Sequence, residues 1–154
     1  MSRWVTLGFV YVFSLLVGFM IIVQWSLVPA QNHLPASAYA MLEQGMNAVL
    51  KTLTPALMIT ALALGVLVLL FAFRRRSNTR VLYVLALISL VVMIVSTLLI
   101  NAPINDAVDA WDAATPPADW QALRDRWEWG HMIRAYVGAF GLLAAHAATI
   151  WDMK

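Results

Sequence analysis

Long stretches without a charged residue constrain this chain more than any other feature. Asp, Glu, Lys and Arg are absent from four runs, at positions 4–42, 52–73, 81–105 and 135–151. A helix needs about 20 apolar residues to cross the hydrocarbon core of a membrane. We therefore predict an all-α integral membrane protein whose spans form a four-helix bundle. The predicted spans cover about 5–28, 54–73, 81–101 and 130–150.

The composition excludes a water-soluble fold. The chain is 62% hydrophobic and only 12% charged, whereas soluble domains carry about 45–50% apolar and about 25% charged residues. Its 154 residues predict a single domain, 1–154. The absence of cysteine excludes disulfides, thiolate metal sites and cysteine nucleophiles.

Basic residues lie on one side of the predicted spans. Arg3, the four arginines within 74–80 and Lys154 fall on this side, while the opposite links carry mostly acidic residues. Because positive charge marks the cytoplasmic side, we predict a multi-pass protein of the bacterial inner (plasma) membrane with both termini in the cytoplasm. A cytoplasmic loop explains the basic cluster better than a nucleic-acid patch. The expected partner is membrane lipid, and no nucleic-acid partner is expected. The sequence is compatible with a homo-oligomer.

Both links on the non-cytoplasmic side are predicted to contain helices that extend the spans. Apolar residues recur at helical intervals through 36–53. Glu43, Asn47 and Lys51, spaced by four, form a polar stripe on another face of that helix. In the second link, Asp119 follows a Pro-Pro break and is a candidate N-cap for a helix that continues into the fourth span.

The fourth span is short, so a charged residue at its start is expected to lie close to the membrane. Only 17 residues separate Arg134 from Asp152, which is roughly 25 Å of helix against a hydrocarbon core of about 30 Å. A charge at that depth usually faces the bundle or a wet cavity. Trp127, His131 and Arg134 share one helical face, with Glu128 beside it. Either these residues form a polar pocket at the outer mouth of the bundle, or Arg134 snorkels to the outer interface.

A second polar group, Asn101-Ala-Pro-Ile-Asn105, ends the third span. The two asparagines would project from one face if the helix continued through Pro103. Alternatively they cap the helix end and satisfy carbonyls that lipid cannot. For either asparagine taken alone, capping is the expected role. The presence of this second group favours the pocket over snorkelling of Arg134.

A metal site is a minority alternative. Glu128 and His131 have the i, i+3 spacing of di-iron bundles, but such a site needs two of these motifs and the chain has one. A mononuclear site could combine His131 and Glu128 with Glu43 or His33. The sequence assigns no other cofactor.

Two motifs make the chain resemble the anthrone-oxygenase-like family. Asn101-Ala-Pro-Ile-Asn105 matches N-x-P-x-N after the third span, and Trp127-Glu-Trp-Gly-His131-Met-Ile-Arg134 matches W-x-x-x-(H/N)-x-x-R entering the fourth. The family consists of small four-span membrane proteins, and its bacterial members are mostly a domain of unknown function. The resemblance covers nearly the whole chain.

The resemblance implies an oxygenase or oxidoreductase that acts on a lipophilic aromatic, anthrone- or quinone-like molecule. Some fungal members oxidise the activated methylene of a polyketide anthrone to the anthraquinone. Such chemistry needs no protein-borne cofactor, because an anthrone carbanion can react with O₂. Residues carried over to the site are Asn101, Asn105, Trp127, His131 and Arg134. The family pattern also has asparagine at the position of His131, which weakens any scheme in which this imidazole is an indispensable base or metal ligand.

The residue types suggest roles at such a site. Arg134 and the amides of Asn101 and Asn105 suit the stabilisation of a developing oxyanion. His131 or Glu128 suits proton removal. The candidates for substrate binding are Trp127, Glu43 and Asn47. The alternative function is a non-enzymatic small membrane protein that binds a lipid or stabilises a membrane complex. A transporter is disfavoured, because transport sites usually lie near the membrane midplane.

Overall fold

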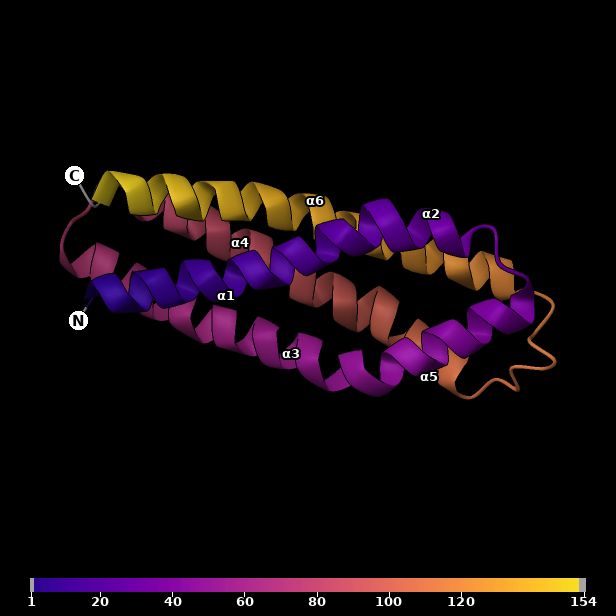
Figure 1. Ribbon diagram of the computed structural model, residues 1–154. Coiled ribbons are helices and arrows are strands. Elements are labelled where there is room, and N and C mark those ends of the chain that lie inside the picture. The colour runs from indigo at the N-terminus through magenta and orange to yellow at the C-terminus, as the bar shows by residue number, and fades with distance from the viewer. Residues whose placement is uncertain (1, 153–154) are drawn as a thin grey trace.

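The computed structural model describes residues 2–152 and is a bundle of four long helical segments (Figure 1). The first segment comprises α1 (Ser2–Ile22), the π-helix η1 (Val23–Leu27) and α2 (Val28–Gln31). The second is α3 (Ala36–Arg74). The third comprises α4 (Arg80–Ser96), the π-helix η2 (Thr97–Asn101) and α5 (Ala102–Asp109), and the fourth is α6 (Trp120–Asp152).

Each segment is long and apolar enough to span a membrane. No strand occurs within residues 2–152. The predicted all-α four-helix membrane bundle is therefore confirmed, and the chain is a multi-pass membrane protein. Lys154, which the sequence places with the other basic residues, lies outside the described residues.

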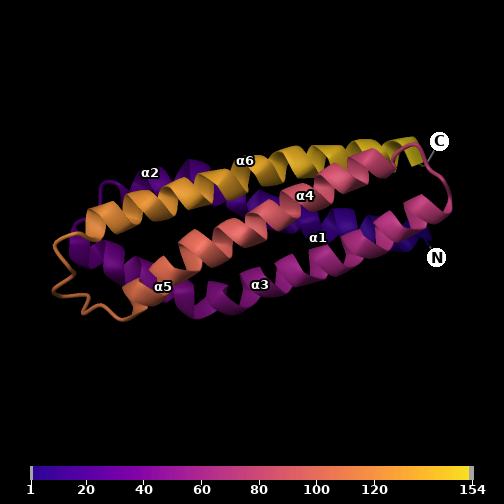
Figure 2. The same cartoon turned by 180° about the vertical axis from the view of Figure 1, so that it is seen from behind.

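The bundle is longer than a membrane is thick. With 39 residues, α3 measures roughly 60 Å, about twice the hydrocarbon core. Both termini lie at one end of the bundle, here named the terminal end (Figures 1 and 2). The opposite end, which contains α2, α5, residues 110–119 and the first turns of α3 and α6, is here named the distal end. The predicted helical extensions are present there, because α3 is unbroken from residue 36 and α6 begins at residue 120.

Close helix contacts fix α6 against its neighbours. A Cβ atom at Gly141 would lie 2.4 Å from Ser89 Cβ, and one at Gly138 would lie 2.8 Å from Met93 Sδ. At Gly141 only glycine admits α4 this closely, because Ser89 Cβ cannot move without the backbone, and such tight packing drives helix association in lipid, where the hydrophobic effect is absent. The position of α6 along α4 is therefore well defined, and with it the level of the polar residues near the start of α6.

Two segments wind into a π-helix near the distal end, each just before a proline. The Val28 N–H bonds to the Val23 carbonyl before Pro29, and the Ala102 N–H bonds to the Thr97 carbonyl before Pro103. These i→i+5 bonds add a residue to the turn and rotate the side chains that follow. Single π turns inside α-helices occur often at functional sites.

The expectation that Asn101 and Asn105 cap a helix end is wrong. The third segment continues through Pro103 to Asp109, and the Asn101 side chain makes no capping hydrogen bond. The π turn accommodates the proline. Pro103 lacks one backbone N–H, but the preceding Ala102 N–H still bonds to the Thr97 carbonyl across the wider turn. Both asparagines instead hydrogen-bond to Trp127 of α6.

Candidate functional site

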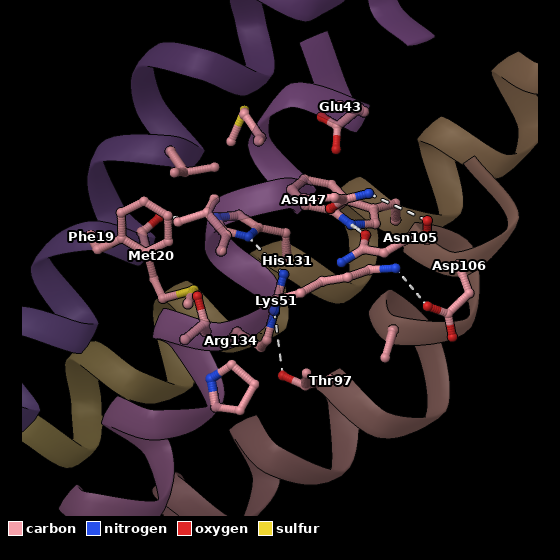
Figure 3. Close-up of a pocket in the computed structure, with 17 residues that line it drawn as sticks. Phe19, Met20, Glu43, Asn47, Lys51, Thr97, Asn105, Asp106, His131 and Arg134 are labelled. Atoms are coloured by element: carbon pink, nitrogen blue, oxygen red, sulfur yellow. Dashed lines mark hydrogen bonds and ion pairs between the residues drawn. The ribbon is translucent and has the colours of Figure 1, made fainter. Parts of the chain in front are cut away.

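A cavity of about 220 Å³ lies between all four segments towards the distal end. Figure 3 shows it with Phe19 and Met20 on one side and polar side chains of the other segments around it. Its apolar wall consists of Phe19, Met20, Val23, Met46, Leu50, Pro55 and Ala102. Its polar wall consists of Glu43, Asn47, Lys51, Thr54, Thr97, Asn105, Asp106, Trp127, His131 and Arg134.

Arg134 brings a buried positive charge to this wall. Its side chain is 5% exposed. Nη1 donates to the Thr97 hydroxyl at 3.3 Å and Nη2 to His131 Nδ1 at 2.9 Å (Figure 3), while Nε is buried without a partner. No carboxylate within residues 2–152 forms an ion pair with this guanidinium. Since buried charges are normally paired, the cavity wall carries an uncompensated cation.

His131 is held by hydrogen bonds at both ring nitrogens. Nε2 lies 3.0 Å from the Met20 carbonyl oxygen, and Nδ1 lies 2.9 Å from Arg134 Nη2. A carbonyl only accepts and a guanidinium only donates, so Nε2 carries the proton and Nδ1 offers its lone pair. This is the neutral imidazole, 1% exposed. In this arrangement neither nitrogen is open to a substrate proton or a metal ion, and the ring orients Arg134.

Trp127 joins the asparagine pair to His131 and Arg134. Its ring stacks on His131, with centroids 5.0 Å apart and planes 6° from parallel, and Arg134 Cζ lies 5.7 Å from the ring centroid. Its Nε1 donates to Asn105 Oδ1 at 2.7 Å, and its carbonyl oxygen accepts from Asn101 Nδ2 at 2.9 Å. The residues of both sequence motifs therefore form one connected network.

Glu43 faces the cavity from α3 and is 2% exposed. Its Oε1 accepts a hydrogen bond from Nε2 of Gln31, a fully buried residue at the end of α2. No basic side chain within the described residues forms an ion pair with this carboxyl group. A carboxyl group and an unpaired guanidinium therefore line the same small cavity.

The other two residues of the polar stripe on α3, Asn47 and Lys51, bind side chains and backbone of α5. Asn47 Nδ2 donates to Asp109 Oδ1 at 2.8 Å and to the Asn105 carbonyl at 3.3 Å. Lys51 Nζ lies 2.7 Å from Asp106 and 2.5 Å from Asp109. These contacts place α5, and with it Asn105, against α3 at the cavity.

Comparison with protein-family models matches residues 41–144 to the family described as anthrone oxygenase. The chain belongs to the anthrone oxygenase family. No curated protein and no solved structure matches it. The matched range contains Glu43, both asparagines, Trp127, His131 and Arg134, whereas the part of the wall that α1 and η1 contribute precedes it. The resemblance drawn from the two motifs is thereby confirmed.

The structure of this anthrone oxygenase family member brings most of the predicted site residues together. Asn105, Trp127, His131, Arg134, Glu43 and Asn47 all line the cavity. Asn101 is fully buried beside it and holds the Trp127 backbone. With Arg134 at 5% and His131 at 1% exposure, the pocket interpretation agrees with the structure and the snorkelling interpretation does not. The chemical role of each residue stays a prediction.

Two predicted residues lie off the cavity wall. Glu128 points along α6 towards Arg124, whose Nε lies 3.6 Å from Glu128 Oε1, and His33 is exposed in the link between α2 and α3. The candidate metal site of His131 and Glu128 with either Glu43 or His33 is not assembled, because residues 2–152 contain no cluster of three such side chains that could hold a metal ion.

Sequence reasoning missed Thr97, Gln31 and the Met20 carbonyl. Thr97 could have been found from its spacing, since it lies four residues before Asn101 and eight before Asn105 in the same charge-free run. Gln31 is a polar residue close to the Pro29 π turn, without a spacing that links it to Glu43. The role of the Met20 carbonyl could not be found from the sequence, because every residue has a backbone carbonyl.

Proposed function

We propose that this protein is a membrane-embedded oxygenase that acts on a lipophilic anthrone- or quinone-like aromatic. The observation that supports this most is the unpaired guanidinium of Arg134 on the wall of a small cavity with apolar sides. Apolar side chains would hold a ring system, as they do in most ligand pockets. The guanidinium would stabilise the negative charge that develops on a ring oxygen.

The proposed reaction converts an anthrone and O₂ to an anthraquinone and water. Removal of a methylene proton leaves a carbanion whose charge is shared with the ketone oxygen. The carbanion carbon bonds to O₂, which takes up the electrons, and the resulting peroxide anion is protonated to a hydroperoxide. Loss of the second C–H proton then breaks the O–O bond, forms the new carbonyl and releases water. One oxygen atom of O₂ enters the product and the other enters water.

Within this proposal, Arg134 stabilises the oxyanion and His131 acts as a positioning residue. Both His131 nitrogens are already hydrogen-bonded, and Glu128 lies away from the cavity. We therefore assign proton removal to Glu43, the buried carboxyl group on the wall. A general base of this kind accelerates a reaction by about 10²–10⁴-fold.

The test is turnover by the purified protein. The full chain in detergent is mixed with anthrone under O₂, and anthraquinone formation and O₂ uptake are followed against detergent alone. We expect equal molar amounts of product and consumed O₂ at a rate above the spontaneous reaction. Saturable anthrone binding without any rate increase would contradict the oxygenase and favour the alternative, a membrane protein that binds a lipophile without converting it.

A further inference from the structure

We propose a second binding site at the terminal end of the bundle, which takes the phosphate headgroup of an anionic phospholipid. A cavity of about 380 Å³ lies there among α1, α3, α4 and α6. Two arginines line it, Arg3 at the start of α1 and Arg75 directly after α3, and both side chains are exposed. This site is separate from the distal cavity and does not depend on the proposed oxygenase function.

The two arginines carry uncompensated charge. Neither Arg3 nor Arg75 forms an ion pair with a carboxylate of the described chain, residues 2–152. Guanidinium groups bind phosphate oxygens through paired N–H donors. Two of them at one cavity therefore favour a phosphate group as the ligand.

One carboxylate, Asp152, also lines the cavity but is occupied by other partners. Its oxygens accept hydrogen bonds from three hydroxyl groups, those of Ser77 at 2.9 Å, Thr79 at 2.8 Å and Tyr83 at 3.3 Å. These donors hold Asp152 towards the start of α4. The cavity therefore keeps a net positive charge from its two arginines and one aspartate.

The rest of the wall favours a lipid over a free phosphate ion. Leu7 of α1 and Val68 and Phe71 of α3 form an apolar side of the cavity, and Leu7 is 45% exposed towards the surroundings of the bundle. The cavity lies at the terminal end, where α1 begins and α6 ends, and the arginine-rich link beside it is predicted to lie at the membrane surface. A phosphate on the arginines would thus place its acyl chains along apolar side chains. Basic residues at this level attract anionic lipids.

The test is a binding titration of the purified full-length protein with short-chain phosphatidylglycerol, phosphatidylcholine and inorganic phosphate. We expect phosphatidylglycerol to bind about tenfold or more tightly than phosphatidylcholine, because each arginine near a headgroup contributes attraction. The double variant Arg3→Gln/Arg75→Gln should lose this preference. The matched control Arg74→Gln/Arg76→Gln removes the same charge from positions that are equally exposed but do not line the cavity, and it should keep the preference.

Three results would overturn the proposal. Equal binding of the two lipids by the unchanged protein would remove the headgroup preference, and this comparison does not depend on any variant folding. Loss of the preference in the control as well would indicate a diffuse basic surface. Displacement of phosphatidylglycerol by equimolar inorganic phosphate would identify a bare phosphate site.

Discussion

Arg134 carries the unpaired charge of the distal cavity, and its place on the cavity wall follows from the direction of its side chain on α6. Periodicity predicted that Trp127, His131 and Arg134 share a helical face, and all three line the cavity. The same reasoning placed Glu128 beside this face. However, the side chains of adjacent residues in a helix point in directions that differ by about 100°. That rotation turns Glu128 towards Arg124. Which member of a polar group faces inward depends on the neighbouring helices, and the sequence of one helix does not contain that information.

Proton removal separates the roles of Glu43 and His131. We predict that Glu43→Gln lowers anthrone turnover about 10²-fold or more, because the proton acceptor is lost, while the hydrogen bond with Gln31 can persist. His131→Asn should cost less than about tenfold, since an amide can still donate to a carbonyl and accept from a guanidinium. Steady-state rates of both variants decide this.

Alkaline pH provides the control for Glu43→Gln. Once solvent ionises the anthrone, the missing base is no longer needed, so the rate of this variant should approach that of the unchanged protein. A larger loss in His131→Asn than in Glu43→Gln would instead make the imidazole the base.

At the level of the elements, the contact between η2 and α6 sets the geometry of the site. A Cβ atom at Gly130 would lie 2.7 Å from Ile100 Cγ2 and 2.8 Å from Asn101 Oδ1. We predict that Gly130→Ala destabilises the protein by about 1–3 kcal/mol through overpacking and displaces Asn101. The measurement is thermal unfolding in detergent.

Gly45→Ala is the matched control, because a Cβ atom there meets nothing within 4 Å. Alanine is favoured over glycine inside a helix by up to about 1 kcal/mol, so this variant should unfold at the same or a higher temperature. Unfolding of Gly130→Ala at the temperature of the unchanged protein would show that the close approach is not structurally important.

The four spans and their extensions could be predicted because hydrophobicity and helical periodicity are local properties of the sequence. The π turns before Pro29 and Pro103 could not. A proline predicts an interruption, but whether the helix stops or continues depends on distant partners. At Pro103 this partner is Trp127, whose Nε1 donates to Asn105 and whose carbonyl oxygen accepts from Asn101. Cavity formation likewise depends on Phe19 and Met20 of α1, which carry no polar signal.

At the level of the whole molecule, the distribution of charge predicts the orientation in the membrane. Both termini and the arginine-rich link between α3 and α4 lie at the terminal end (Figure 1), so we predict that this end is cytoplasmic. Alkaline phosphatase attached after Lys154 should be inactive in bacterial cells, whereas the same reporter inserted within 110–119 should be active. The reverse pattern would place the cavity on the cytoplasmic side.

The proposed role of the unpaired Arg134 cation in the distal cavity is tested most directly by measuring anthrone turnover in Arg134→Gln. This change leaves no carboxylate without its partner, because Arg134 has none within the described residues, so the fold should be retained. We predict a rate loss of about 10²–10³-fold, the cost of removing one oxyanion donor. Arg126→Gln, an exposed change on the same helix, should keep the full rate. A folded Arg134→Gln protein that turns over anthrone as fast as the unchanged protein would contradict an oxyanion role for this charge.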